Sequence, residues 1–197
     1  MNGKTTREQI IEAADRLFYQ QGFEHTSFAD ISQAVNISRG NFYYHFKSKD
    51  EILDAVIKLR FLRTQTLLNT WEKHNQHPLE RIRSFVNILI MNQNKIISYG
   101  CPVGTLCSEL NKLNHSAEAD ANKLFDLFRQ WLGQQFILLG HVDTADELAL
   151  HVLAFSQGVA TLANAFSDEI FVQREVNNMG KWLDSLTIET QHNHIFV

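Results

Sequence analysis

The chain has 197 residues, of which 44% are hydrophobic and 20% are charged, a composition typical of a folded globular protein with one or two domains. Charges interrupt the apolar positions of the first residues and no run of about 18 apolar residues occurs, so we expect no signal peptide, no transmembrane helix and a cytoplasmic location. The formal net charge is -4, but residues 1–63 hold nine Lys and Arg against eight Asp and Glu, which favours a protein that approaches a polyanion with one end only.

Residues 4–21 are predicted to form the first helix, because their apolar side chains recur at the i, i+3, i+4 spacing of an amphipathic helix. The residues that give this pattern are Ile10, Ala13, Ala14, Leu17 and Phe18. Gly22 follows at the position where a left-handed C-terminal cap is expected.

A short second helix and a tight corner come next. Ser27 followed by Asp30 resembles a capping box and predicts a helix over about residues 27–34. Asn36 is expected to take a left-handed conformation at the corner, because Asn tolerates it better than most residues. Ser38 is then expected to cap a third helix.

The third helix is predicted to have two different faces. At 100° per residue, Phe42 and Phe46 fall on one side and suit packing against the first two helices. The opposite arc carries Gly40, Tyr43, Tyr44 and Lys47.

The outward arc has the chemistry of a nucleic-acid contact. A glycine in a helix costs about 1 kcal/mol relative to alanine, so Gly40 suggests that a partner approaches the backbone closely. Tyr, His and Lys side chains suit phosphate groups, whereas Arg39 and Asn41 have the bidentate geometry that reads guanine and adenine edges. The face therefore predicts a helix that lies in a DNA groove, with a merely solvated amphipathic face as the alternative.

Together these segments resemble the DNA-binding domain of the TetR family of transcriptional regulators over about residues 5–60. The motifs that carry the resemblance are Gly22-Phe23, Thr26-Ser27, Ser38-Arg39-Gly40-Asn41-Phe42-Tyr43-Tyr44-His45-Phe46 and Ser48-Lys49. The resemblance implies contacts to the DNA backbone from Thr26, Ser38, Tyr43, His45 and Lys49. It implies base contacts from Arg39, Gly40, Asn41 and Tyr44, and the predicted DNA-binding set also includes Ser27 and Lys47.

A domain boundary is expected near residue 50. Ser48, with Glu51 three residues later, predicts the cap of a fourth helix over about residues 49–73 that links two domains. The resemblance implies a DNA-binding domain over residues 1–50 and a ligand-binding and dimerisation domain over residues 51–197. The predicted fold is all-α, with an N-terminal three-helix helix-turn-helix domain and a larger C-terminal helical domain.

The middle of the chain is predicted to hold an effector pocket. Helical patterns reach to about residue 97 and run again from about 117 to 139, and a break at Gly100-Cys101-Pro102 separates them. The segment GCPVGTL resembles one in a subset of the family. Because a member of this family needs a pocket, we predict one lined by large apolar side chains, namely Trp71, Phe85, Leu89, Leu106, Leu110, Phe125, Phe128 and Trp131.

Two long helices are predicted in the last third, over about residues 145–166 and 171–186. Large and small residues alternate along the first of them, which permits close approach of another helix. The resemblance implies that these helices form the homodimer interface, with Leu148, Val152, Phe155, Val159 and Leu162 as its core. Burial of these side chains within one subunit is the alternative.

No enzyme motif was found. The sequence has no HExxH, no GxSxG and no glycine-rich loop after a strand, so we expect no enzyme activity, no bound metal and no cofactor. Cys101 and Cys107 are six residues apart across a helix break and leave a thiol sensor of oxidants or electrophiles as an alternative, although burial is the commoner fate of such residues.

The function implied by the resemblance is that of a homodimeric, sequence-specific DNA-binding regulator. We expect a repressor that binds double-stranded DNA at a pseudo-palindromic operator and leaves it when a small hydrophobic or aromatic effector binds, with no membrane partner. The alternatives are a thiol sensor on the same scaffold and a helical carrier of hydrophobic molecules that does not bind DNA. A carrier would have no use for the Tyr43-Tyr44-His45 face.

Overall fold

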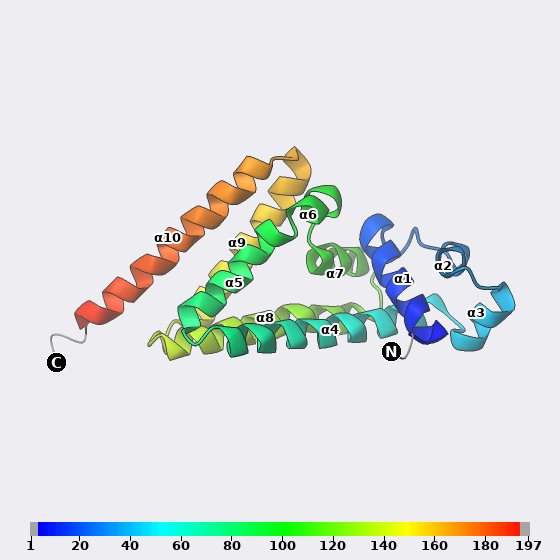
Figure 1. Cartoon of the computed structure of the whole chain (residues 1–197), viewed down its shortest axis with the longest axis horizontal. Coiled ribbons are helices and arrows are strands. Elements are labelled where there is room, and N and C mark those ends of the chain that lie inside the picture. The colour runs from blue at the N-terminus through cyan, green and yellow to red at the C-terminus, as the bar shows by residue number, and fades with distance from the viewer. Residues whose placement is uncertain (1–3, 194–197) are drawn as a thin grey trace. The chain divides into compact units, whose positions relative to one another are not determined.

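The structure is a computed structural model that describes the backbone of residues 4–193 and the side chains of residues 4–186 (Figure 1). Regular structure in this part of the chain is α-helical throughout, which confirms the all-α prediction. The helices are α1 (Thr6–Gln21), α2 (Phe28–Val35), α3 (Arg39–His45), α4 (Lys49–His74), α5 (Pro78–Met91), α6 (Gln93–Tyr99), α7 (Pro102–Lys112), α8 (Glu118–Leu138), α9 (Ala145–Phe166) and α10 (Glu169–Asn193).

By their contacts the helices fall into two compact units. Within the described residues, unit 1 comprises the chain up to Gln65 together with Pro102–Leu124, and unit 2 comprises Thr66–Cys101 together with the chain from Phe125 onward. Unit 1 thus includes α7, which was predicted to belong, with the rest of residues 51–197, to the ligand-binding domain. The grouping rests on contacts alone, so the division by function stays a prediction.

α1 begins with a capping box. The Thr5 hydroxyl accepts a hydrogen bond from the Glu8 N–H at 3.3 Å, and the Glu8 carboxylate accepts one from the Thr5 N–H at 2.8 Å. Because Thr5 is the cap, the helix begins at Thr6 rather than at residue 4. The buried apolar side chains of unit 1 include Ile10, Ala14, Phe18, Ile31, Phe42, Phe46, Ile52, Leu53 and Val56.

The end of α1 differs from the prediction. Gly22 has a φ of 89° and a ψ of 158°, a combination that is almost restricted to glycine but lies outside the left-handed helical region. The expected left-handed cap is therefore wrong. The physical reason is that the next two N–H groups, of Phe23 and Glu24, donate to Glu109 of α7 instead of turning back to α1.

The corner between α2 and α3 confirms the local predictions. The Ser27 hydroxyl accepts a hydrogen bond from the Asp30 N–H at 3.2 Å, and the Asp30 carboxylate accepts one from the Ser27 N–H at 2.8 Å. Asn36 is left-handed, with φ 56° and ψ 49°. The Ser38 hydroxyl accepts a hydrogen bond from the Asn41 N–H at 3.3 Å and caps α3.

A buried arginine joins α1, α4 and α7 within unit 1. Arg60 is 8% exposed, and it donates to the Asp15 carboxylate and to the Pro102 carbonyl, each at 2.6 Å. Arg63, one turn further along α4, donates to the other Asp15 oxygen at 3.0 Å from a more exposed position. One aspartate therefore binds two arginines that differ in burial.

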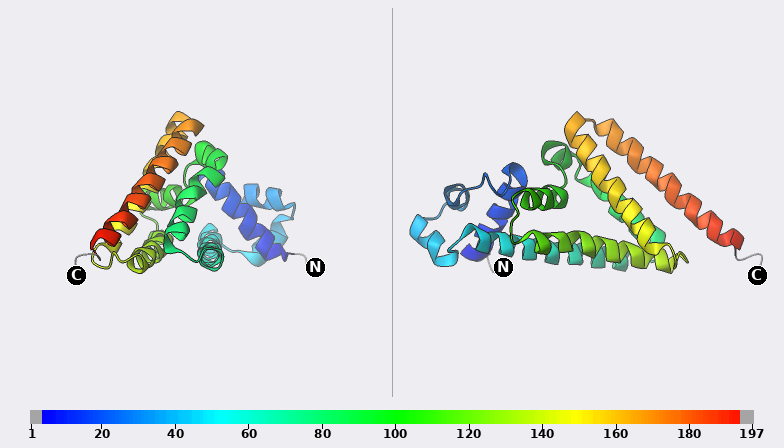
Figure 2. Two further views of the ribbon diagram at one scale, coloured as in Figure 1. Left: turned by 60° about the vertical axis from the view of Figure 1, so that its left-hand side comes forward. Right: turned by 180° about the vertical axis from the view of Figure 1, so that it is seen from behind.

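In unit 2, α5, α9 and α10 pack together and α6 packs against α9, as the two further views also show (Figure 2). Trp71 of α4 and Trp131 of α8 form an aromatic pair with 5.7 Å between ring centroids. The Trp131 indole N–H donates to the Glu72 carboxylate at 2.7 Å. The core of the unit includes Ile82, Phe85, Val86, Leu89, Leu132, Phe136, Val152, Val159, Val176, Met179 and Leu183.

α9 is the most apolar of the long helices. Its length and composition would also allow it to cross a membrane, properties that the core helix of a soluble protein shares, so the expected absence of a transmembrane helix stays a prediction. In the structure, however, one side of α9 is buried in the core of unit 2, through Ala149, Val152, Val159 and Ala163 among others. Core packing therefore accounts for part of its apolar character.

Candidate nucleic-acid interface

Two buried phenylalanines orient α3 within unit 1. Phe42 and Phe46 are each 1% exposed, and the Phe42 ring packs on Phe28 of α2 with 5.1 Å between ring centroids. This packing turns the opposite face of α3 outward, where Tyr44 is 78% exposed. The predicted inward and outward faces of this helix are therefore confirmed.

Gly40 lies on the outward face, and the chain itself does not require a glycine there. A Cβ built on Gly40 would have no atom within 4 Å. The missing side chain instead leaves bare helical backbone between the exposed side chains of Arg39 and Asn41. A duplex can approach the backbone closely at this point, which suits the predicted role of all three residues.

The chain fixes part of the outward face in place. Tyr43 is 38% exposed, and its ring meets Phe28 edge-on with 5.5 Å between centroids. Lys47 donates a hydrogen bond to the Tyr43 carbonyl at the end of α3. The Tyr44 ring meets His45, which is half-buried, with 5.1 Å between centroids. A tyrosine ring and a lysine held in this way suit directed contacts to phosphate groups.

Ser27 and Ser38 are exposed, but their hydroxyl groups already serve as helix caps. Hydrogen bonds from the Ser27 hydroxyl, and to a smaller extent from the Ser27 N–H, lower the pKa of Asp30 below its ordinary value. Asp30 is therefore a charged carboxylate beside Ser27 at neutral pH. Because this charge repels phosphate, we infer that the main role of Ser27 is to cap α2 rather than to bind DNA.

Thr26 and Lys49 do not lie on the outward face. Thr26 is 1% exposed, and its hydroxyl donates to the Gly22 carbonyl at 2.6 Å. The Lys49 ammonium donates to the Phe23 carbonyl at 3.0 Å and to the Glu24 carbonyl at 3.2 Å. In the structure both side chains support the turn between α1 and α2, and their DNA contacts stay a prediction.

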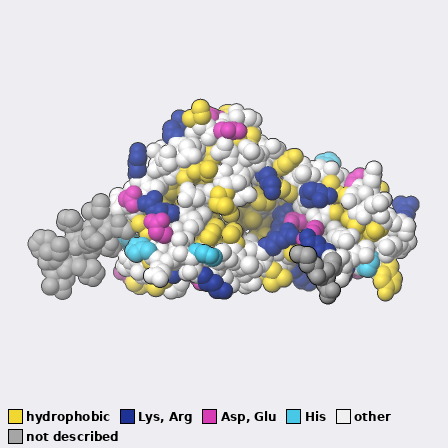
Figure 3. Space-filling view, in the orientation of Figure 1, with side chains coloured by type: hydrophobic (Ala, Val, Ile, Leu, Met, Phe, Trp, Pro, Cys, Tyr) yellow, Lys and Arg dark blue, Asp and Glu magenta, His cyan; other side chains and the backbone are white. Residues whose placement is uncertain are grey.

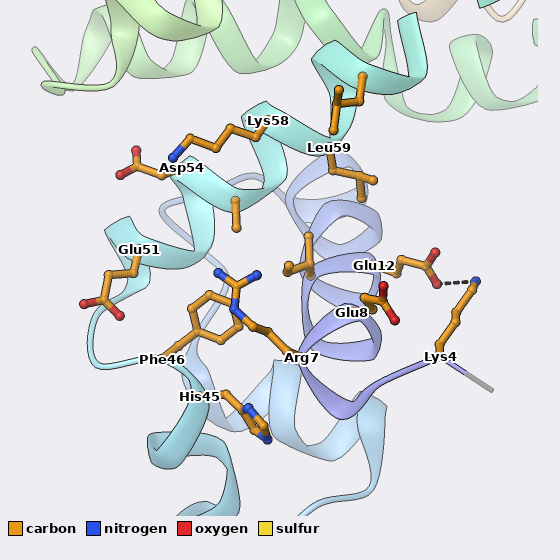
Figure 4. A pocket seen from close by; sticks show the side chains of 13 residues that line it. Lys4, Arg7, Glu8, Glu12, His45, Phe46, Glu51, Asp54, Lys58 and Leu59 are labelled. Carbon is orange, nitrogen blue, oxygen red and sulfur yellow. Dashed lines mark hydrogen bonds and ion pairs between the residues drawn. The ribbon is translucent and has the colours of Figure 1, made fainter. Parts of the chain in front are cut away.

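A hollow of about 550 Å³ lies between α1 and α4 in unit 1 (Figure 4). Arg7 points into it, with its guanidinium 4.8 Å from the centroid of the Phe46 ring, and Lys4 pairs with Glu12 at 2.6 Å. In the space-filling view, basic and acidic side chains lie close together over α1 (Figure 3). The mixed charges neutralise one another, so this hollow does not extend the outward face of α3 as a basic surface.

The residues predicted to line an effector pocket are divided between the two units. Leu106 and Leu110 are buried in α7 of unit 1. The other six belong to the core of unit 2 or pack against it, and they are Trp71, Phe85, Leu89, Phe125, Phe128 and Trp131. A hollow of about 540 Å³ in unit 2 has a different lining, formed by residues 90–95 and Gln173. The effector site therefore stays a prediction.

The residues predicted for the dimer interface are also divided. Val152 and Val159 are 0% and 5% exposed and belong to the core of their own chain. Leu148 and Phe155 are half-buried, and Leu162 is exposed. The two valines are therefore removed from the interface prediction, because α9 is apolar on both sides and periodicity does not tell them apart.

A second apolar stripe is exposed on α9. Its members are Leu150, Ala154, Gly158, Leu162 and Phe166, with Phe166 at 70% exposure. Its two small residues, Ala154 and Gly158, follow one another along the stripe and leave room for another helix. This stripe, defined by these five residues, is the better candidate for the dimer interface.

The cysteines and histidines form no distinct site within the described residues. Cys101 is half-buried, Cys107 is buried, and no disulfide joins them. In the same part of the chain, no group of three or more His, Cys, Asp and Glu is arranged to hold a metal ion.

Two supports of the interface, Arg60 and Glu109, were not predicted from the sequence. Arg60 follows Ile52 and Val56 at a spacing of four residues, so it lies on the apolar face of α4. A charge in that position was a signal that a buried partner exists. Glu109 gave no comparable local signal.

Comparisons with known proteins agree with this geometry. The model of the family described as bacterial regulatory proteins, tetR family, matches residues 10–56. The HTH-type transcriptional regulator TtgR of Pseudomonas putida is 27% identical over 91% of this chain and 89% of its own length. The HTH-type transcriptional repressor DhaR of a Mycobacterium species is 26% identical over 64% of this chain and 61% of its own length.

The fold is also found in a solved structure. A TetR transcriptional regulator from Legionella pneumophila aligns with a TM-score of 0.81 and 27% identity, over 94% of this chain and 98% of that one. Three findings agree. The family model covers the segment that contains α3, TtgR is similar over most of the chain, and the solved structure has the same fold. Residues 10–56 form a DNA-binding domain of the tetR family, and the chain is a DNA-binding regulator that is similar to TetR regulators over most of its length.

Proposed function

We propose that the protein is a cytoplasmic repressor that binds a pseudo-palindromic operator as a homodimer and leaves it when a small, largely apolar or aromatic effector binds. The observation that carries the proposal is the outward face of α3, where Arg39, Asn41 and Tyr44 are exposed beside the bare backbone of Gly40. The name of the relative DhaR, a transcriptional repressor, supports repression rather than activation.

The exposed stripe of α9 supports the proposed homodimer. Five exposed small and large apolar residues on a helix that already buries its other side need a partner, and a second copy supplies an identical stripe. A two-fold dimer presents its two copies of α3 to one side of the duplex. The half-sites then lie one helical turn apart, a distance of about 34–36 Å. The operator is then pseudo-palindromic because the protein is symmetric.

The DNA-reading role predicts different defects for two residues of α3. Asn41→Ala is expected to lose the preference for one base in each half-site, worth about 1–3 kcal/mol, because the side chain can bind an adenine edge at two points. Lys47→Ala is expected to weaken binding to every sequence and to reduce the slope of log K against log salt by about one. Selection from a random duplex pool, followed by salt titrations, measures both.

Asn87→Ala is the matched control, because Asn87 is an exposed asparagine on α5. It should select the same sequences as the wild-type protein with the same affinity. If Asn41→Ala also enriches an unchanged motif, Asn41 does not read a base. If the wild-type protein enriches no motif at all, the operator proposal fails.

The effector proposal rests on the aromatic content of unit 2. Trp71 and Trp131 form one ring pair, and Phe85 and Phe128 form another with 5.3 Å between centroids. Aromatic rings of this kind bind flat apolar molecules. A panel of hydrophobic compounds added to the protein on its selected duplex identifies those that release it.

Serine replacement of both cysteines is expected to leave this release intact. The Cys101→Ser, Cys107→Ser protein should leave DNA at the same compound concentration as the wild type, because the proposed effector packs against aromatic rings and needs no thiolate. Competition binding on the selected duplex measures the midpoint. Release of the wild type by peroxide, combined with a double-serine protein that responds to neither peroxide nor compounds, would instead support the thiol sensor.

A further inference from the structure

The turn between α1 and α2, residues Gly22–Thr26, is held by a carboxylate from a distant helix. The N–H groups of Phe23 and Glu24 donate to the two carboxylate oxygens of Glu109, each at 2.9 Å. Glu109 lies on α7, more than eighty residues further along the chain and in the same compact unit. Hydrogen bonds from backbone N–H groups to an ionised carboxylate are among the stronger ones in proteins.

A lysine holds the other side of the same peptide groups. The Lys49 ammonium donates to the Phe23 carbonyl at 3.0 Å and to the Glu24 carbonyl at 3.2 Å. It also lies 4.3 Å from the centroid of the Phe23 ring. The peptide group between Phe23 and Glu24 is therefore bound by a negative charge at its N–H and by a positive charge at its C=O.

The conformation of Gly22 lets Glu109 bind the turn. Gly22 has a φ of 89°, and a Cβ there would lie 2.9 Å from one Glu109 oxygen and 3.3 Å from the other. The Phe23 ring is 2% exposed and meets Phe18 and His115 at 5.3 Å and 5.1 Å between centroids. The absence of a side chain at Gly22 is thus what lets the Glu109 carboxylate reach the turn.

The turn leads directly into the helices that read DNA. Thr26, its last residue, is tied to Gly22, and Ser27 immediately after it caps α2. α2 packs on α3 through Phe28, which touches both Phe42 and Tyr43. A shift of the turn is therefore passed through α2 to the outward face of α3.

We propose that Glu109 is a positioning residue for DNA reading, which fixes the α1–α2 turn from α7 without touching DNA itself. The proposal rests on the DNA-reading surface proposed above. The expected change in DNA affinity is opposite to the usual effect of removing an acidic residue. Removing an acidic side chain from a DNA-binding protein ordinarily strengthens binding, because repulsion of phosphate is reduced. Removing this one weakens binding, because the turn loses its shape.

The test uses the full-length protein and a duplex that the wild type selects from a random pool. Glu109→Ala is expected to bind that duplex at least about tenfold more weakly, because the turn loses both of its charge-assisted hydrogen bonds to Glu109. Glu109→Gln keeps one carbonyl oxygen as an acceptor and should recover part of the affinity. Glu147→Ala, which removes an exposed glutamate from α9, is the control and should bind at least as tightly as the wild type.

Amide hydrogen exchange separates positioning from general stability. The N–H groups of Phe23 and Glu24 should exchange faster in Glu109→Ala, and only one of them should do so in Glu109→Gln, while the amides inside α4 and α9 stay protected. Binding is compared at a temperature where circular dichroism shows each variant fully helical. Weaker binding with exchange confined to the turn supports the proposal even if the melting temperature also falls.

Two outcomes would overturn the proposal in distinguishable ways. If Glu109→Ala binds the selected duplex as tightly as the wild type while the turn exchanges faster, the turn does not position α3 and the positioning role is wrong. If the wild type selects no duplex, the proposed operator binding fails, and the positioning role fails with it.

Discussion

The Gly158→Glu protein is expected to be a monomer of 22.7 kDa in solution, where the wild type is a dimer of twice that mass. Gly158 lies in the exposed stripe of α9, and a Cβ there would have no atom of its own chain within 4 Å. The monomer therefore accommodates the new side chain. In the proposed dimer the carboxylate would be buried against the partner helix without a counter-charge, at a cost of several kcal/mol. Light scattering at micromolar concentration measures the mass.

A glutamate at the neighbouring Val159 would not test the dimer in the same way. Val159 is 5% exposed and belongs to the core of unit 2, so Val159→Glu should unfold the chain whether or not a dimer exists. Gly158→Ala is the control that adds a methyl group without charge, and it should keep both the fold and the dimer. A folded Gly158→Glu protein that still has the mass of a dimer would place the interface outside this stripe.

Loss of Arg60 is expected to destabilise the protein far more than loss of Arg63, although both bind Asp15. The Arg60 side chain is 9% exposed and also holds the Pro102 carbonyl, so Arg60→Ala leaves two partly buried acceptors with fewer partners and should cost about 3 kcal/mol. The Arg63 side chain is 51% exposed, and Arg63→Ala should cost less than about 1 kcal/mol.

Urea unfolding at one protein concentration measures both variants against the wild type. The two arginines lie three residues apart on α4 and share the Asp15 carboxylate, but Arg60 also binds the Pro102 carbonyl and Arg63 also pairs with Glu12. The comparison therefore measures burial together with the bond to Pro102. Equal losses of stability for the two variants would show that the exposed pair is as important as the buried one. The tie between α4 and the start of α7 would then contribute little.

Features that depend on a few neighbouring residues were predictable from the sequence. Ser27 and Ser38 cap helices through N–H groups three residues away, and Asn36 takes the left-handed conformation expected of its short polar side chain. The two faces of α3 followed from helical geometry, because Phe42 and Phe46 are one turn apart. Such features need no knowledge of the rest of the chain.

Features that depend on distant residues were not predictable in this way. Lys49 was expected to contact phosphate, but its carbonyl partners lie 26 and 25 residues earlier in the chain. The conformation of Gly22 is set by Glu109, whose amide partners are separated from it by 86 and 85 residues. No local pattern records pairings of this length, so only the folded structure reveals that both charges serve the turn.

Helix α9 shows a further limit of periodicity. An apolar pattern identifies the buried side of a helix only when the other side is polar. Val152 and Leu162 both fit an apolar pattern, yet the first is in the core of its own chain and the second is exposed. A helix with two apolar sides has two partners, and the sequence does not say which side meets which.

The tryptophan pair of unit 2 has a practical consequence for spectroscopy. The chain has three tryptophans, Trp71, Trp131 and Trp182, and all of them lie in unit 2. The indole of Trp131 is bound to Glu72 and lies beside Trp71, so a molecule that enters this cluster changes the polarity around both rings. The reading surface carries Tyr43 and Tyr44 but no tryptophan. Tryptophan emission is therefore an unlabelled optical signal from unit 2, and α3 contributes only tyrosine emission.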